Sequence, residues 1–163
     1  MYQKAARNWF VRLLTLSIIL GVCSSAHAAS PINTLEKSGL FKYRPSTVAI
    51  RGYDTVAYFT LGKPQKGRAE FSHNWNNVDW HFASEDHLAL FKGDPARYAP
   101  QFGGYCAYGV AEGYLAKIEG SQWTIVDGKL YLNYSKKFNK LWRQQPEVYI
   151  EQAKLRFEQL LAN

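Results

Sequence analysis

The side chains with the most distinctive chemistry in this sequence are one cysteine and two histidines. Cys106 lies in the glycine-rich stretch QFGGYCAYGVAEGY, and His73 and His87 precede it. Thiolates and imidazoles are ligands of borderline and soft metals such as copper and zinc. Cys106, His73 and His87 therefore form a candidate metal set. No pair among them has a motif spacing such as C-x-x-C, so the spacing alone identifies no metal site.

Cys106 also has a redox interpretation and a purely structural one. As a catalytic thiol it would need a neighbouring cation, a metal or a helix N-terminus to favour its thiolate. No resolving cysteine lies near it in the sequence, so a thiol–disulfide cycle would need an external thiol. The structural alternative is a buried cysteine that behaves as a small apolar residue.

The two histidines have different expected surroundings. His73 falls on the apolar face of a predicted hairpin, where it is either a core residue or a partner of Cys106. His87 falls at the third position of a predicted helix, where the helix dipole favours the neutral ring. That ring is either a metal ligand or a solvated surface histidine.

The first 28 residues have the layout of a cleavable secretory signal. A basic start precedes the ten-residue apolar run LLTLSIILGV and a small-x-small site that ends at Ala28. That run is shorter than the roughly 20 apolar residues that span a bilayer. We expect cleavage after Ala28 and export to the periplasm or the medium. Lipid anchoring at Cys23 is not expected, because Val22 precedes it.

Composition limits the remaining classes. The signal contains three basic and no acidic residues, so the mature chain of 135 residues has 17 basic and 13 acidic side chains, a net charge of +4. This mild excess does not indicate a nucleic-acid partner. The length fits one domain, and no stretch after the signal is apolar enough to span a membrane.

A hairpin is predicted over AEFSHNWNNVDWHF, residues 69–82. A two-residue turn at Asn76-Asn77 pairs neighbouring residues outward from the turn. The predicted pairs are Trp75 with Val78, His73 with Trp80, and Phe71 with Phe82. The same register places apolar side chains on one face and polar side chains on the other, and it directs His73 and His81 to opposite faces.

The other elements predict an α+β fold. Asp127-Gly128 in WTIVDGKLYLNY indicates a second hairpin over 123–134 with a type I′ turn. Helices are predicted where a capping residue precedes an apolar pattern. They are a short helix near 34–40, one over 84–93 capped by Ser84, one after Asp94, and a C-terminal pair that begins after Ser135 and is interrupted at Pro146. Asp54 is placed to cap a short helical turn or the entry to a strand. Hairpins surrounded by helices belong to the α+β class rather than to a parallel sheet.

Residues 49–113 resemble the YHS-domain family, in particular its exported stand-alone branch. The motifs that carry the resemblance are GYDTVAYF, WHFAS and DPARYAPQFGGYCA, and it continues through VDGKLYLNYS. It divides the chain into a signal (1–28), a lead-in segment (29–48), a YHS-like domain (49–135) and a C-terminal helical extension (136–163). The fold that this resemblance implies is small hairpins packed with short helices.

The resemblance implies a metal-related role, but this sequence lacks most of the cysteine ligands of the metal-binding relatives. YHS domains occur with metal-transporting ATPases and metal-dependent hydroxylases. In metal-binding relatives cysteines stand at the position of Ala57 and at about those of Ala83 and His87, so only His87 keeps ligand chemistry here. The exported branch includes selenoproteins, and selenocysteine is expected at the position of Cys106, which favours redox or soft-ligand chemistry there.

Three functions follow as hypotheses. The first is a non-catalytic module that binds a metal ion or metal-linked ligand through Cys106, with His73 or His87 as helpers. The second is a single-thiol redox enzyme that uses Cys106. The third is an aromatic-lined module for a small molecule or protein. The candidate ligand-binding residues are Cys106, Tyr105, Tyr53, Asp54 and Trp80.

One further surface has a charge pattern that could bind a ligand. Lys136, Lys140 and Arg143 form a basic stripe opposite the apolar face of a predicted helix. The stripe could meet phosphates or an acidic partner, or it could be the solvated side of the helix.

Overall fold

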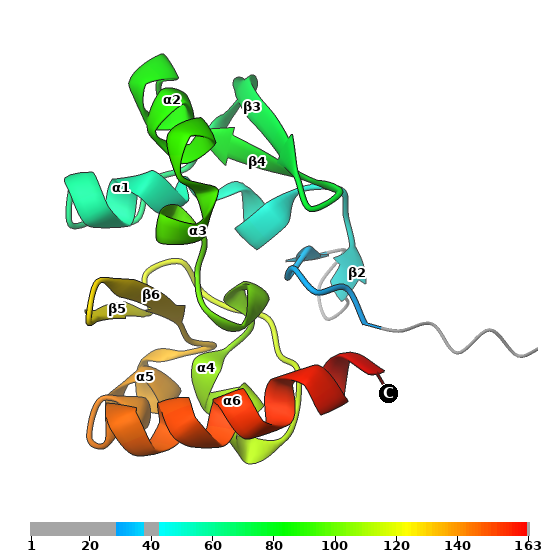
Figure 1. Cartoon of the computed structure of the whole chain (residues 1–163), viewed down its shortest axis with the longest axis vertical. Coiled ribbons are helices and arrows are strands. Elements are labelled where there is room, and N and C mark those ends of the chain that lie inside the picture. The colour runs from blue at the N-terminus through cyan, green and yellow to red at the C-terminus, as the bar shows by residue number, and fades with distance from the viewer. Residues whose placement is uncertain (1–28, 38–42, 163) are drawn as a thin grey trace, which may run out of the picture.

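Short helices surround three antiparallel hairpins in the part of the chain that the structure describes (Figure 1). The computed structural model describes residues 29–37 and 43–162. Its strands pair in twos: β1 (Leu35–Lys37) with β2 (Tyr43–Pro45), β3 (Arg68–Trp75) with β4 (Val78–Phe82), and β5 (Trp123–Val126) with β6 (Lys129–Leu132). The α+β prediction is confirmed.

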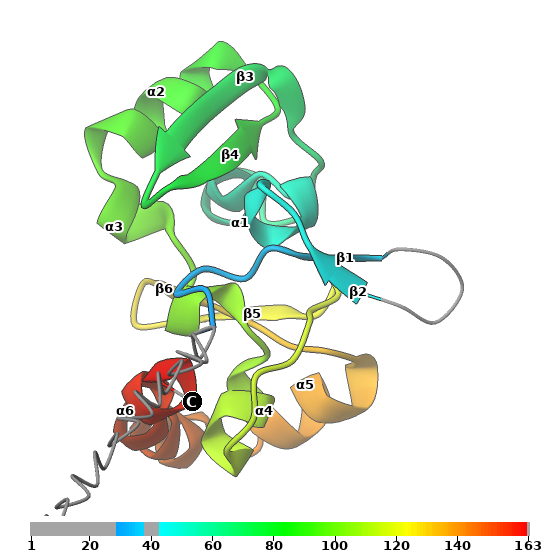
Figure 2. The ribbon, with the colours of Figure 1, turned by 90° about the vertical axis from the view of Figure 1, so that its right-hand side faces the viewer.

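Helices connect and cover these hairpins. The two 3-10 segments are η1 (Ala49–Gly52) and η2 (Phe102–Gly104). The α-helices are α1 (Thr55–Thr60), α2 (Glu85–Gly93), α3 (Pro95–Tyr98), α4 (Ala107–Glu112), α5 (Lys136–Trp142) and α6 (Pro146–Ala162). Figures 1 and 2 show α1, α2, α3 and the β3–β4 hairpin at one end of the molecule. The β5–β6 hairpin, α4, α5 and α6 form the other end.

The β3–β4 hairpin has the predicted turn and most of the predicted register. Trp75 pairs with Val78 and His73 with Trp80. Both turn residues, Asn76 and Asn77, have positive φ (52° and 62°), as a type I′ turn requires. The Asp127-Gly128 turn of the β5–β6 hairpin also has positive φ at both positions, as predicted.

The predicted Phe71–Phe82 pair is wrong, because a bulge shifts the register further along β3. Ser72 still pairs with His81, but Phe82 pairs with Arg68. The bulge accommodates the extra residues of β3 opposite the shorter β4. Phe71 nevertheless packs against the core, and the Arg68 guanidinium lies 4.7 Å from the centroid of its ring.

The predicted short helix near 34–40 is also wrong over the part of it that the structure describes. Residues Leu35–Lys37 are strand β1, and residues 38–40 lie outside the described part of the chain. Asn33 explains the difference: its Oδ1 accepts from the Leu35 N–H (3.0 Å), a local turn that competes with a helix start. Its Nδ2 donates to the carbonyl of Gly104 (3.0 Å), a residue distant in the sequence. This second hydrogen bond holds the buried Asn33 side chain in place.

Four predicted helix caps are confirmed by their hydrogen bonds. In each case the side-chain oxygen accepts from backbone N–H groups of the first helical turn. The four capping residues are Asp54 (α1), Ser84 (α2), Asp94 (α3) and Ser135 (α5). The sequence therefore places most helix starts correctly.

The aromatic core at the first end centres on Phe91 of α2, which is fully buried. Its ring lies 5.0 Å from Trp80 and 4.9 Å from Phe82, centroid to centroid, so α2 is fixed on the inner face of the hairpin. At the other end Ala153 of α6 packs in one cluster with Val110 of α4. The C-terminal extension thus shares a hydrophobic core with the region that contains Cys106.

The N-terminal predictions fall mostly outside the described residues. The signal segment 1–28 and Cys23 are among the residues that the structure does not describe. The described lead-in starts against the end of α6, where the Ala29 N–H donates to the Leu161 carbonyl (3.2 Å). Within the described ranges no helix has the length and apolar character needed to cross a membrane.

Replacing Phe91 with alanine should destabilise the protein by about 3–5 kcal/mol, because it removes a fully buried ring and leaves a cavity. Urea unfolding followed by tryptophan fluorescence measures the change. The matched control is Leu90→Ala on the exposed side of α2, where 41% of the residue is accessible. A Phe91→Ala loss no larger than that of Leu90→Ala would contradict the described packing.

Candidate functional site

Asp54 is a fully buried carboxylate that caps helix α1. Its Oδ1 accepts from the backbone N–H groups of Val56 (2.9 Å) and Ala57 (3.2 Å). A buried charge is tolerated only where hydrogen bonds or an opposite charge replace water. Backbone N–H groups in the first turn of α1 therefore supply the hydrogen bonds that Oδ1 of this carboxylate needs.

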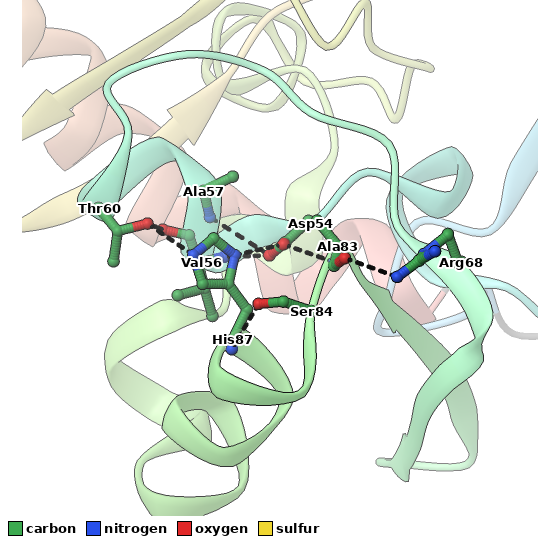
Figure 3. Close-up of polar contacts among 8 residues, drawn as sticks. All are labelled: Asp54, Val56, Ala57, Thr60, Arg68, Ala83, Ser84 and His87. Carbon is green, nitrogen blue, oxygen red and sulfur yellow. Dashed lines mark hydrogen bonds and ion pairs between the residues drawn. The ribbon is translucent and has the colours of Figure 1, made fainter.

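The second oxygen of Asp54 joins two other elements to this helix (Figure 3). Oδ2 accepts from the Ala83 N–H (2.9 Å) at the end of β4. It also lies 2.5 Å from Nδ1 of His87 in the first turn of α2. The carboxylate thus joins α1, the end of the β3–β4 hairpin and α2 at one point.

The imidazole of His87 is held between Asp54 and a surface hydroxyl. Its side chain is 12% exposed, and its Nε2 lies 3.0 Å from Oγ1 of Thr60, an exposed residue at the end of α1. Figure 3 shows the ring between these two partners. With a proton on Nδ1 donated to Asp54, Nε2 becomes the ring's acceptor and faces the hydroxyl. This arrangement positions one imidazole nitrogen toward the protein surface.

A left-handed turn precedes Asp54 and sets its position. Ile50 (φ 52°), Arg51 (φ 56°) and Gly52 (φ 71°) are consecutive, and for a β-branched residue such as Ile50 this conformation is strained. Two contacts hold the turn: the Ile50 N–H donates to the Asn33 carbonyl (2.9 Å), and Arg51 forms an ion pair with Glu119 (3.0 Å). The chain then enters α1 with its capping carboxylate directed inward.

Cys106 lies in a sealed polar position. Its exposure is 1%, and it is the N-cap of α4. The sulfur accepts from the N–H groups of Gly109 (3.4 Å) and Tyr134 (3.3 Å), and the thiol donates to Oδ1 of Asn133 (3.5 Å). Burial raises the pKa of the Cys106 thiol, and backbone hydrogen bonds to the sulfur offset part of that increase. The thiol therefore favours its neutral form, unlike a reactive cysteine.

The sulfur of Cys106 is one end of a short buried hydrogen-bond network. Asn133 donates from Nδ2 to Oδ1 of Asn139 (3.2 Å), which also accepts from Oγ1 of Thr124 (3.3 Å). Asn133 is fully buried and 9% of Asn139 is exposed. This network joins the start of α4, the end of β6 and α5. It is therefore a structural connection within the end of the molecule that the β5–β6 hairpin, α4, α5 and α6 form.

The structure does not bring the three candidate metal ligands together. His73 lies on β3, partly buried, with its ring 6.4 Å from the Phe91 ring, centroid to centroid. His87 contacts Asp54 and Thr60, and the hydrogen-bond partners of Cys106 are Asn133, Gly109 and Tyr134. Within residues 29–37 and 43–162, no three side chains of His, Cys, Asp or Glu are grouped as a metal site requires. These residues fit one imidazole ligand at His87, not a chelating set.

The candidate ligand-binding aromatics are mostly occupied by internal contacts. Trp80 is 1% exposed, and its Nε1 donates to the Trp75 carbonyl (3.1 Å). Tyr105 is 4% exposed, and its hydroxyl donates to the Ser30 carbonyl (2.9 Å). The Tyr53 ring packs on Gly120, where an added Cβ would lie 2.3 Å from the ring. These three residues support the fold rather than line an open ligand surface.

Sequence reasoning missed three polar residues at these positions. They are Thr60, Asn133 and Asn139. A signal for Asn133 was available, because an asparagine that directly follows the apolar strand β6 is unusual at a buried position. For Thr60 no local pattern could have indicated its contact with a histidine 27 residues away.

Comparisons with protein-family models, with curated proteins and with solved structures each found no match for the chain. The resemblance to the YHS-domain family therefore stays a prediction based on the sequence motifs.

Replacing Asp54 with asparagine should cost about 3–5 kcal/mol, because one carboxylate oxygen becomes a donor and His87 loses its charged partner. Chemical denaturation measures this loss in the free energy of unfolding. The control is Asp86→Asn in the exposed first turn of α2, for which the free energy of unfolding should change by less than about 1 kcal/mol. Equal losses in the two variants would contradict the central role of Asp54.

Cys106 should react slowly with iodoacetamide in the folded protein and rapidly in denaturant, because the thiol is buried and its pKa is raised.

A raised folded-state pKa also means that the Cys106 thiol stabilises the fold below its ordinary pKa, near 8.5, and that this contribution is lost as the pH rises above that value. Cys106→Ser removes it, so the stability difference between wild type and variant should shrink above about pH 8.5. Urea titrations from pH 7 to 10 measure it, and a difference that grows with pH would contradict the sign.

Proposed function

We propose that the protein is a non-catalytic binding module of the YHS type that takes a metal ion on Nε2 of His87. One observation carries the proposal: Asp54 holds Nδ1 of this ring at 2.5 Å and leaves Nε2 facing a hydroxyl at the surface. Metal-ligating histidines usually donate their second nitrogen to a carboxylate or carbonyl in this way. The bound ion would act as a Lewis acid that links the module to another ligand.

The positions suggested by family resemblance support the same location. The resemblance places cysteine ligands of metal-binding relatives at the positions of Ala57, Ala83 and His87. Here the backbone N–H groups of Ala57 and Ala83 both donate to Asp54, and His87 contacts the same carboxylate. Position 57 and the nearby pair of positions 83 and 87 therefore converge on one point, and His87 alone among them has a side chain that can ligate a metal.

A single imidazole selects the kind of ion that can bind. Imidazole suits copper and zinc, but one ligand gives weak affinity for an aqueous ion. Among the described residues, His87 belongs to no group of three or more His, Cys, Asp or Glu side chains that could hold a metal ion. The proposed ligand is therefore a metal ion that already has other ligands and one open position, a metal-linked ligand rather than a bare ion.

Cys106 contributes less support to this function than His87. The environment of its sulfur is buried and neutral, and its hydrogen-bond partners are backbone N–H groups and an amide. A redox thiol needs solvent access and a lowered pKa. The observed environment instead suits a structural cap of α4.

Export of the module is also part of the proposal, because the sequence predicts a secretory signal over residues 1–28.

The order Thr60–His87–Asp54 also matches the connectivity of a hydrolytic triad. One contact favours binding over nucleophilic catalysis: Oγ1 of Thr60 is placed to donate to the Val56 carbonyl (3.1 Å). That carbonyl competes with His87 for the one hydroxyl proton that a general base would have to remove. Binding is the function that this geometry favours.

Copper(II)–iminodiacetate, a complex with open coordination positions, is a direct probe of the proposal. We expect binding with one-to-one stoichiometry by calorimetry, and loss of at least tenfold in affinity for His87→Gln, whose amide can still donate to Asp54. The matched controls His73→Gln and His81→Gln, two partly buried hairpin histidines, should keep wild-type affinity within about twofold. Equal affinity of His87→Gln and wild type would refute the proposal.

Two further variants separate binding from catalysis. Thr60→Val removes the hydroxyl that contacts Nε2 and should preserve or raise metal affinity, whereas a triad would lose esterase activity. Ala83→Cys adds a thiol beside Asp54 and His87, and it should raise zinc affinity at least tenfold. No gain from Ala83→Cys, together with activity that depends on Thr60, would favour the hydrolytic alternative.

A further inference from the structure

Two lysines of α5 and its C-cap residue Arg143 line a groove that shares no lining residue with the His87 region. The groove, of about 590 Å³, is lined by Gln122, Lys136, Asn139, Lys140, Arg143 and Gln144. A second hollow of about 580 Å³ continues from it over the β5 strand and shares Asn139 and Arg143. The size of each hollow is in the range of small-molecule sites. Figure 1 shows α5 next to the β5–β6 hairpin, and residues of β5 line the second hollow.

The charge of this groove is of one sign. Lys136, Lys140 and Arg143 follow a spacing of four and three residues, so they share one face of the helix. No Asp or Glu lines either hollow, and no carboxylate within the described ranges forms an ion pair with these three cations. Like charges at this spacing repel one another, and a bound anion would relieve that repulsion.

A buried amide that lines the groove has unused donor capacity. Asn139 lines both hollows and is 9% exposed. Its Oδ1 accepts from Thr124 and Asn133, which fixes the orientation of the amide. Its Nδ2 makes no hydrogen bond to any residue that the structure describes. A fixed donor beside three cations suits the oxygen atoms of a phosphate group.

The second hollow supplies a different surface. It is lined by Ser121, Trp123, Thr124 and Ile125 in addition to the shared residues. The Trp123 ring is partly buried and packs on Tyr58 with centroids 5.3 Å apart, so it is held in place. Such a ring offers an apolar contact for a flat organic group next to the cationic part.

We propose that this groove binds a small phosphorylated molecule. Its phosphate groups would contact Lys136, Lys140, Arg143 and the Asn139 amide, and its organic part would lie over the surface that contains Trp123. The site is independent of the metal proposal, because it uses other residues and other chemistry. Lys140 and Arg143 set the affinity for the phosphate, and the Trp123 surface sets the preference for what the phosphate is attached to.

The test compares inorganic pyrophosphate, ATP and adenosine as ligands of the full mature protein, by calorimetry at about 0.15 M ionic strength, where exposed charges are partly screened. We expect ATP to bind more tightly than pyrophosphate and adenosine to bind at least tenfold more weakly than ATP. Two-dimensional NMR should show the Trp123 indole signal shifting with ATP but little with pyrophosphate. Absence of ATP binding, or no shift of that signal, would overturn the proposal.

A charge-matched pair of variants distinguishes a site from general electrostatic attraction. Lys140→Ala with Arg143→Ala should reduce ATP affinity at least tenfold. Lys63→Ala with Lys92→Ala removes the same charge from exposed positions outside the groove and should change it less than twofold. Equal losses in the two pairs would overturn the proposal. Heparin binding that is tighter than ATP binding and equally reduced in both pairs would assign the surface to polyanions instead.

Discussion

The carboxylate of Asp54 is the contact on which the arrangement of the first end of the molecule depends. It is fully buried, and four hydrogen-bond donors from three segments surround its two oxygens. Burying a carboxylate costs free energy unless such donors are in place, so the three segments stabilise the charge only when all have assembled. The interaction therefore favours one arrangement of α1, α2 and the hairpin end over looser alternatives.

Cys106 has a comparable position at the other end, with a much weaker acceptor. Its sulfur caps α4 and accepts from the N–H groups of Gly109 in α4 and of Tyr134, which follows Asn133 after the end of β6. A thiol forms weaker hydrogen bonds than a carboxylate, but it is cheaper to bury in neutral form. The two anchors differ in charge for a physical reason: a histidine is available to pair with Asp54, and the hydrogen-bond partners of Cys106 carry no charge.

Local patterns in the sequence predicted the elements, and tertiary contacts decided what the patterns missed. The turn at Asn76-Asn77 and the caps at Asp54 and Ser84 depend on neighbouring residues, so the sequence indicates them directly. The contact between Asp54 and His87 joins residues 33 positions apart and depends on how α2 docks on the hairpin. No periodicity contains that information.

The same distinction explains why the sequence draws attention to Cys106 more than to Asp54. A cysteine is conspicuous in a sequence because it is rare and reactive, whereas an aspartate before a short helix is read as a cap. Reactivity, however, is set by surroundings: the thiol is enclosed and its pKa is raised, while the aspartate orients an imidazole toward the surface.

The contacts of Ala57, Ala83 and His87 with Asp54 differ in what they require of the side chain at each position. Two of the three contacts are made by backbone N–H groups, which remain whatever side chain stands there. Only the third contact needs a particular side chain, and a histidine at that position supplies it. The side chains at the first two positions can therefore vary without unpairing the carboxylate, whereas the third position is constrained by its contact with Asp54. The buried charge of Asp54, with donors from three segments, is therefore the element that holds this end of the molecule together.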